Sequence, residues 1–102
     1  MTEAERLVRD YLDAGDRGDV DELARLLDPD VVTRSPGGVT THGSGALIES
    51  WRIAHEGLGG LRHDVVDVLA DGSTAVARVR VRGAHTGRFL GIEPTGARIE
   101  VD

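Results

Sequence analysis

The sequence predicts a single α+β domain of 102 residues, with helices in its first half and an antiparallel sheet in its second. Apolar residues recur at helical spacing over the first half, and they alternate at strand spacing after Gly59-Gly60. An Asp71-Gly72 pair separates two of the alternating segments, as in a β-hairpin. Helices followed by a run of antiparallel strands define the α+β class.

The first helix carries its own start and stop signals. Thr2 and Glu5 have the spacing of a capping box, which favours a helix start. Apolar residues then follow one side of a helix of about three to four turns. Gly15 and Gly18 are expected to end this helix. The apolar stripe consists of Leu7, Val8, Tyr11 and Leu12.

A second, shorter helix and a strand follow. Asp19 is a good N-cap residue, and Asp28-Pro29 stops the helix because the residue before a proline avoids helical geometry. Val31 to Arg34 is a short strand candidate, whereas residues 35–45 are rich in glycine, serine and threonine and are predicted to form a loop. The buried side of the second helix consists of Leu23, Ala24, Leu26 and Leu27.

The rest of the chain reads as one more helix and then a meander of strands. The helix spans about Ser44 to Leu58, and strands follow at residues 63–70 and 74–85, on either side of the Asp71-Gly72 turn. A final strand, Arg98 to Asp102, is cut off at the last residue. The apolar side of the third helix consists of Leu47, Ile48, Trp51, Ala54 and Leu58.

The alternation of the long strand places His85 on its apolar face. An imidazole at the end of such a face, followed by the glycine-rich segment HTGRFLGIEPTG, is a candidate for the rim or floor of a cavity. The alternative is a structural histidine that hydrogen-bonds the following loop. The outer arginines are predicted to form solvated surface or a dimer contact, with an anionic partner as a further alternative. The apolar face carries Ala75, Ala77, Val79, Val81, Gly83 and His85, and the outer face carries Arg78, Arg80 and Arg82.

Composition excludes several classes of function. The net charge of −6 argues against a nucleic-acid backbone as the main partner. The absence of cysteine excludes disulfides, a thiol nucleophile and a cysteine-ligated metal, and it is consistent with a cytoplasmic protein. Apolar runs of only a few residues predict no contact with the membrane interior, and the acidic N-terminal segment does not look like a secretory signal.

The segment GAHTGRFLGIEPTGARIEV resembles the signature of the SnoaL-like polyketide cyclases (ester cyclases) of the NTF2-like superfamily. That family reads G-x-H-T-G-x-F-x-G-I-x-P-T-G, and this sequence has the family residue at every fixed position. The rest of the chain also resembles the family, from Val8 to Asp102. The matching residues are Gly83, His85, Thr86, Gly87, Phe89, Gly91, Ile92, Pro94, Thr95 and Gly96.

The resemblance implies a cone-shaped fold, in which a curved antiparallel sheet and the helices surround a deep apolar pocket. Family enzymes use this pocket, without metal or cofactor, to close a ring in a polyketide ester by intramolecular aldol condensation. A carboxylate in a dry pocket removes a proton beside a carbonyl, and hydrogen-bond donors hold the enolate oxygen. The resemblance places His85 in the pocket and makes it a catalytic candidate. The residues expected to contact a small apolar carbonyl compound are Tyr11, Trp51, Val79, Val81 and Phe89.

Two departures from the family pattern bear on this expectation. The family's acid/base aspartate lies on the last strand, and this sequence ends before that strand; Asp102 lies on the preceding strand and receives no catalytic role. Thr33 and Arg34 stand where members often carry a polar Asp-His pair. The resemblance predicts a homodimer. The missing strands indicate that the natural protein is longer, that a partner chain supplies them by strand sharing, or that the short form is marginally stable.

Other polar residues give weaker signals. Asp67 is the candidate to replace the missing carboxylate, because its strand neighbours that of His85 in the hairpin. His63 and Asp67 share a strand face but lack a third ligand at diagnostic spacing, so no metal site is predicted. His42 is a candidate for the pocket mouth or for a solvated loop. His55, near a helix end, is predicted to be structural.

Three functional hypotheses remain open at this point. The leading one is a cofactor-free enzyme of the polyketide-cyclase type, in which His85 polarises a carbonyl and a carboxylate acts as base. The second is an NTF2-like module that holds an apolar ligand without chemistry. The third is a scaffold that folds only as an oligomer. The sequence does not name a substrate.

Overall fold

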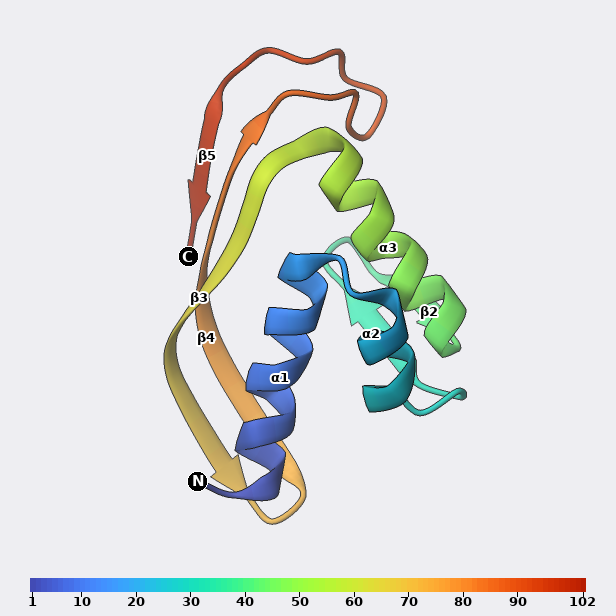
Figure 1. The fold of residues 1–102 in the computed structure, drawn as a ribbon, viewed down its shortest axis with the longest axis vertical. Helices are drawn as coiled ribbons and strands as arrows, with labels where there is room; N and C mark the ends of the chain where they lie inside the picture. The colour runs from blue at the N-terminus through green and yellow to red at the C-terminus, as the bar shows by residue number, and fades with distance from the viewer.

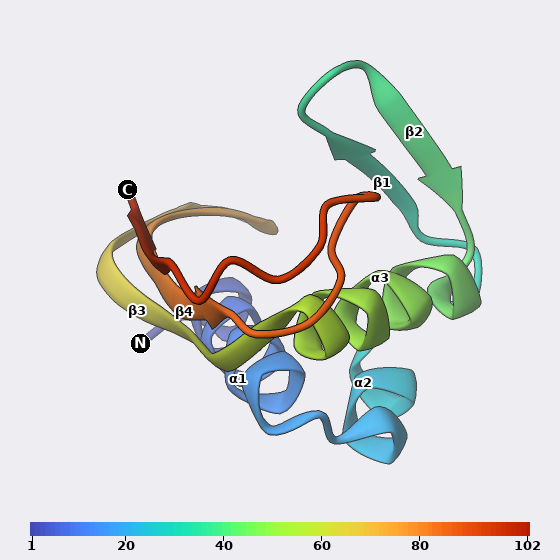
Figure 2. The same ribbon diagram turned by 90° about the horizontal axis from the view of Figure 1, so that it is seen from above.

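The first and third of three helices pack against the concave face of a curved antiparallel sheet, and the second packs on these two helices, in the computed structural model, which describes residues 1–102 (Figure 1). The sheet has the strand order β3-β4-β5, and a separate hairpin, β1-β2, lies beyond α3 (Figure 2). The predicted α+β class is therefore confirmed. No helix has the length and apolar character needed to cross a bilayer. The elements are α1 (Glu3–Arg17), α2 (Val20–Leu26), β1 (Val32–Ser35), β2 (Val39–His42), α3 (Ser44–Gly57), β3 (Leu58–Asp71), β4 (Thr74–His85) and β5 (Arg98–Val101).

Helix α1 begins as predicted but does not end at Gly15. The Thr2 hydroxyl accepts a hydrogen bond from the backbone N–H of Glu5 at 3.1 Å. The helix continues through Gly15 to Arg17 and ends at Gly18, whose left-handed backbone has a φ of 66°. Gly15 is needed for packing rather than termination, since a Cβ atom there would lie 2.3 Å from the indole of Trp51.

Alanine substitutions at Gly18 and at Gly45 should change the free energy of unfolding in opposite directions. Neither has an atom within 4 Å of an added Cβ, but only Gly18 has a positive φ. Gly18→Ala should lower the free energy of unfolding by about 1 kcal/mol, because a side chain in the left-handed region is strained. Gly45→Ala, inside α3, should raise it by about 0.5 kcal/mol. Urea unfolding measures both, and shifts in the same direction would contradict this interpretation.

The β3-β4 hairpin dominates the sheet and is longer than predicted. Strand β3 begins at Leu58, directly after α3, and not at residue 63. A register shift between Gly59 and Arg62 accommodates the two glycines, and a second shift lies between Val65 and Asp67. In β4, the burial pattern confirms the predicted alternation, with the apolar residues turned inward and the arginines outward.

The prediction that residues 35–45 form a loop is wrong in part. Residues Val39–His42 form β2 and pair with β1 in a hairpin whose turn contains Gly37 and Gly38, both with positive φ. Composition favoured a loop because glycine and threonine dominate the segment. The hairpin does not pair with the larger sheet, and the side chains of Val32 and Val39 are exposed.

The core is small, with Trp51 at its centre. The Trp51 ring meets Tyr11 edge-on and lies against Gly15. Partly buried residues from all three helices and from the sheet pack around this cluster. The buried apolar residues are Ala14, Leu23, Trp51, Leu58 and Leu61.

Candidate functional site

A cavity of about 280 Å³ lies between α1, α3 and the concave face of the sheet. Most of its lining is apolar, which is typical of pockets that bind small organic molecules. Three of the five residues expected to contact a ligand, Tyr11, Trp51 and Val81, line it, whereas Val79 and Phe89 do not. The full lining is Tyr11, Leu47, Ser50, Trp51, Ala54, Leu58, Leu61, His63 and Val81.

His63 is the titratable imidazole in this lining, and Asp16 of α1 holds it in place. One carboxylate oxygen of Asp16 lies 2.6 Å from Nδ1 of His63, and the other accepts the backbone N–H of His63 at 2.6 Å. Both side chains are more than four-fifths buried. A carboxylate can only accept at Nδ1, so the neutral imidazole carries its free lone pair on Nε2.

Nε2 of His63 remains available for chemistry. This nitrogen makes no hydrogen bond within the chain. It is also accessible, since the two enclosed side-chain nitrogens without a partner are Arg9 Nε and His85 Nε2. A histidine that is fixed by a carboxylate at one nitrogen and open at the other has the arrangement of a general base. The pair of Asp16 and His63 can therefore take up and return a proton at the edge of an apolar cavity.

Tyr11, whose hydroxyl is free to donate, lines the same cavity as His63. The indole N–H of Trp51 donates to the Tyr11 oxygen at 2.8 Å, and the hydroxyl makes no other hydrogen bond, so its own proton is free. Burial raises the pKa of Tyr11, and the hydrogen bond from Trp51 offsets this by less. The phenol thus stays protonated at neutral pH. Trp51 packs against both side chains, with its ring centroid 5.7 Å from that of Tyr11 and 5.0 Å from that of His63.

Sequence reasoning missed Asp16 and assigned no catalytic role to His63. The two residues lie 47 positions apart, and Asp16 belongs to an Asp-rich stretch at a helix end, where acidic residues are ordinarily solvated. The available signal was the face of the strand that carries His63. Leu61 and His63 both line the cavity, so His63 faces α1 across the sheet interface.

His85 is buried but does not line the cavity. Its side chain is 8% exposed, Nδ1 lies 3.0 Å from the Thr95 hydroxyl, and Nε2 is enclosed without a partner. The backbone N–H of His85 donates to Ala97, and its carbonyl accepts from Gly96. The interpretation as a histidine that bonds the following loop describes these contacts better than the rim of a cavity.

Glycines in and around the HTG segment allow it to pack closely on the junction between α3 and β3. A Cβ atom at Gly87 would lie 1.9 Å from the Glu56 carbonyl oxygen, and one at Gly57 would lie 2.5 Å from the Phe89 ring. The backbone N–H groups of Thr86 and Gly87 both donate to the Gly57 carbonyl. The motif therefore fixes the direction in which β3 leaves α3, and so the position of His63.

The placement of Asp67 beside His85 is wrong. The register shift after Val65 turns Asp67 to the outer face, where it is 62% exposed and bonds Arg78 at 2.7 Å. His85 lies at the opposite end of the hairpin, opposite Leu58. Asp67 therefore shares neither a face with His63 nor a neighbourhood with His85.

The remaining histidines do not reach the cavity. His42 is exposed on β2, and Nε2 of His55 lies 2.7 Å from the Gly15 carbonyl, where it ties α3 to α1. Nowhere do three His, Cys, Asp or Glu side chains meet in an arrangement that could hold a metal ion. The cavity therefore offers one imidazole, the free hydroxyl proton of Tyr11 and a mostly apolar wall, while the Ser50 hydroxyl donates to the Ala46 carbonyl.

Comparisons with known proteins agree with this architecture. The SnoaL-like domain family model matches residues 8–102. A candidate SnoaL-like polyketide cyclase from Jannaschia sp. CCS1 superposes with a TM-score of 0.87 at 25% identity, and the match covers 96% of this chain and 70% of that protein. For IdmH, a candidate polyketide cyclase from Streptomyces antibioticus, the TM-score is 0.80 at 22% identity, with 97% and 77% covered. No curated protein matches this chain.

The same fold also occurs in a protein that is named for a different enzymatic activity. An M. tuberculosis LEH-like epoxide hydrolase superposes with a TM-score of 0.73 at 19% identity, and the match covers 96% of this chain and 66% of that protein. At such low identity the likeness concerns the fold alone. The family model, by contrast, spans nearly the whole sequence, including the HTG segment and both strands of the long hairpin. The chain belongs to the SnoaL-like domain family, with its NTF2-like α+β fold.

Proposed function

We propose that this protein binds a small apolar carbonyl compound in the cavity between α1, α3 and the sheet and catalyses proton transfer at the carbon beside the carbonyl. Intramolecular aldol-type ring closure is the reaction that this chemistry serves. The observation that carries the proposal is the His63 imidazole, which is held by Asp16 at Nδ1 and is open at Nε2 beside an apolar cavity. Membership in the SnoaL-like family supports the same class of reaction.

The residues of the cavity supply a base and a hydrogen-bond donor for this reaction. His63 Nε2 removes the proton from the carbon, and the Asp16 carboxylate stabilises the resulting imidazolium. The carbonyl oxygen becomes an enolate oxygen and receives a hydrogen bond from the Tyr11 hydroxyl, which Trp51 orients. The wall around both groups is mostly apolar, and a bound ligand that covers it strengthens both interactions.

Ring closure then follows without further groups. The enolate carbon attacks a second carbonyl of the same molecule, so one carbon–carbon bond forms and the second oxygen becomes an alkoxide. The imidazolium of His63 returns its proton to that alkoxide. The proton count balances over the cycle, and the protein ends in the state in which it began.

Proton exchange tests the proposal without knowledge of the natural substrate. The protein is incubated in D₂O with 2-tetralone, an apolar bicyclic ketone, and deuterium incorporation beside the carbonyl is followed by ¹H NMR. We expect a rate that exceeds the buffer rate, saturates with ketone and is inhibited by tetralin, the hydrocarbon of the same shape. Binding of the ketone without accelerated exchange would overturn the enzymatic proposal and favour a binding module.

A further inference from the structure

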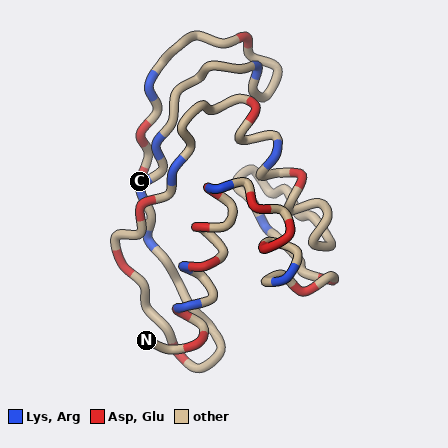
Figure 3. Tube along the Cα trace, in the orientation of Figure 1, with Lys and Arg blue, Asp and Glu red and all other residues tan.

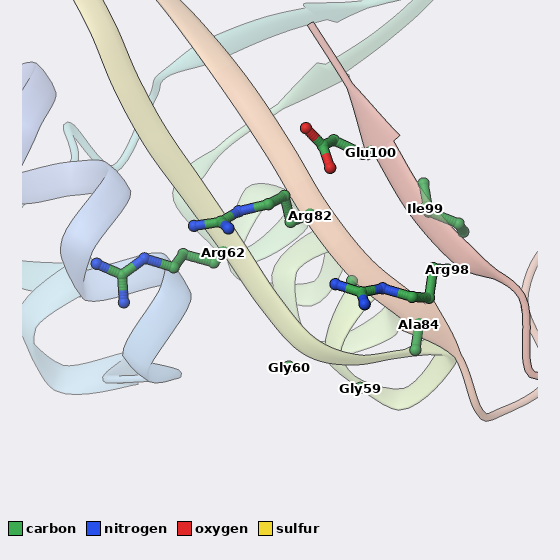
Figure 4. A pocket seen from close by; sticks show the side chains of 9 residues that line it. Gly59, Gly60, Arg62, Arg82, Ala84, Arg98, Ile99 and Glu100 are labelled. Atoms are coloured by element: carbon green, nitrogen blue, oxygen red, sulfur yellow. The ribbon is translucent and has the colours of Figure 1, made fainter.

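We propose that the outer face of the sheet carries a second binding site, for a carboxylate group. A hollow of about 390 Å³ opens at the end of the sheet where β3 leaves α3, and its lining includes one arginine from each of three strands, of which Arg82 and Arg98 reach across neighbouring strands (Figure 4). None of its lining residues lines the apolar cavity. The lining is Gly59, Gly60, Arg62, Arg82, Gly83, Ala84, Arg98, Ile99 and Glu100.

The strand register explains why this part of the sheet is hollow. One cross-strand row consists of Gly59, Ala84 and Arg98, and the next consists of Arg62, Arg82 and Glu100. The extra residue of the bulge, Gly60, has a φ of 64° and no side chain. The floor is therefore backbone and one methyl group, while long side chains stand around it. Arg98 extends from β5 across β4, and Arg82 extends from β4 across β3 (Figure 4).

The charges of this face do not cancel. Basic and acidic residues are interspersed along the three strands (Figure 3). Asp64 pairs with both Arg62 and Arg82, and the hydrogen bonds from these two guanidinium groups hold the pKa of Asp64 below its usual range. The remaining pairs on this face join Arg78 to Asp67 and Arg80 to Glu100 and Asp102.

Arg98 is the arginine of the outer face that has no carboxylate partner. Five arginines meet four carboxylates there, so one positive charge is left over, at the rim of the hollow. This surplus occurs on a chain whose net charge is −6. A single uncompensated guanidinium next to an unfilled hollow is a recognition element for an anion.

The geometry favours a carboxylate over a phosphate. A guanidinium group presents two parallel N–H donors that match the two oxygens of a carboxylate. Arg82 shares its acidic partner Asp64 with Arg62, so Arg82 keeps N–H donors that Asp64 does not use, whereas the Arg62 side chain extends toward α1 (Figure 4). The surplus of one charge is balanced by a monoanion, and Glu100 on the rim repels a phosphate dianion more strongly than it repels a carboxylate.

An NMR titration at constant ionic strength tests the site. The probes are sodium benzoate, sodium phosphate and sodium chloride, added to ¹⁵N-labelled protein. We expect benzoate to give saturable shifts of the Arg98 Nε–H and the Gly59 and Gly60 amides, with sodium chloride giving none. Arg98→Gln should weaken benzoate binding at least about tenfold, the effect of a lost charge-assisted hydrogen bond.

The matched control is Arg78→Gln. It removes the same charge from the same face, but Arg78 is paired with Asp67 away from the hollow, so benzoate binding should stay within about twofold of the wild-type value. Equal losses in the two variants would overturn the site and indicate general charge screening. Shifts that grow linearly with all three salts would also overturn it, and tighter binding of phosphate than of benzoate would overturn the choice of a carboxylate.

Discussion

Replacement of Trp51 by alanine should lower the free energy of unfolding by about 3–5 kcal/mol, the usual cost of deleting a buried aromatic side chain. A domain of this size has a total stability of roughly 5–15 kcal/mol. Trp51 is 8% exposed and belongs to a core of only five buried apolar residues. Loss of this one side chain therefore removes a large fraction of what holds the helices on the sheet.

The loss of stability is expected at the upper end of this range because Trp51 packs against several elements at once. It fills the space over Gly15, donates to Tyr11 and lies against the ring of His63, so its removal leaves a cavity that α1, α3 and β3 all border. The backbone at these contacts is helical or paired in the sheet, which limits how far the site can collapse.

Urea unfolding followed by far-UV circular dichroism measures this prediction, since Trp51 is the chain's one tryptophan and its fluorescence is lost with it. Leu7→Ala is the control. Leu7 lies on α1 but is 45% exposed, so its truncation should cost less than about 1 kcal/mol. A Trp51→Ala variant that loses no more than Leu7→Ala would show that the core does not depend on the indole.

Local signals in the sequence predict the elements that depend on neighbouring residues. The Thr2 and Asp19 caps, the start of α3 near Ser44 and the alternation of β4 all follow from patterns within a few positions. What local signals miss depends on contacts across the fold. Gly15 looks like a helix end, yet it continues the helix because Trp51, 36 positions later, packs on it.

The same difference between local signals and long-range contacts applies to the residues of the site. The cavity residues Tyr11, Trp51 and Val81 follow from which side of a helix or strand is apolar. The phase of β3 cannot be counted from sequence spacing, because the bulge after Val65 reverses it and moves Asp67 outward. The partnership of His63 with Asp16 joins α1 to β3 and has no local signature.

The HTG segment illustrates a motif that identifies a family more clearly than it identifies a chemical role. The family resemblance directed attention to His85, whose side chain bonds Thr95 and whose second ring nitrogen is enclosed. The tightest contacts of the segment are those of Gly87 and Phe89 with the α3-β3 junction. We infer that its effect on the cavity is indirect, because it fixes the path of β3 and so the place of His63.

His63→Gln should reduce the protein-catalysed deuterium exchange of 2-tetralone by at least about 100-fold, the lower range for loss of a general base. Glutamine keeps a polar side chain of similar length but cannot accept a proton near neutral pH. His42→Gln, an exposed change on β2, should leave the rate unchanged.

The variant Asp16→Asn tests the orientation of the His63 imidazole while the imidazole itself remains. Asparagine can still accept a hydrogen bond, but its amide can also donate to Nδ1 of His63, which would place the ring proton on Nε2 and block proton abstraction. The variant also loses the negative charge that stabilises the imidazolium. We expect a loss of at least about tenfold, smaller than that of His63→Gln, since the ring itself remains. Circular dichroism of each variant distinguishes lost chemistry from lost fold. If both folded variants exchanged at the wild-type rate, the base would have to lie elsewhere, and the open nitrogen of His63 would be a consequence of packing alone.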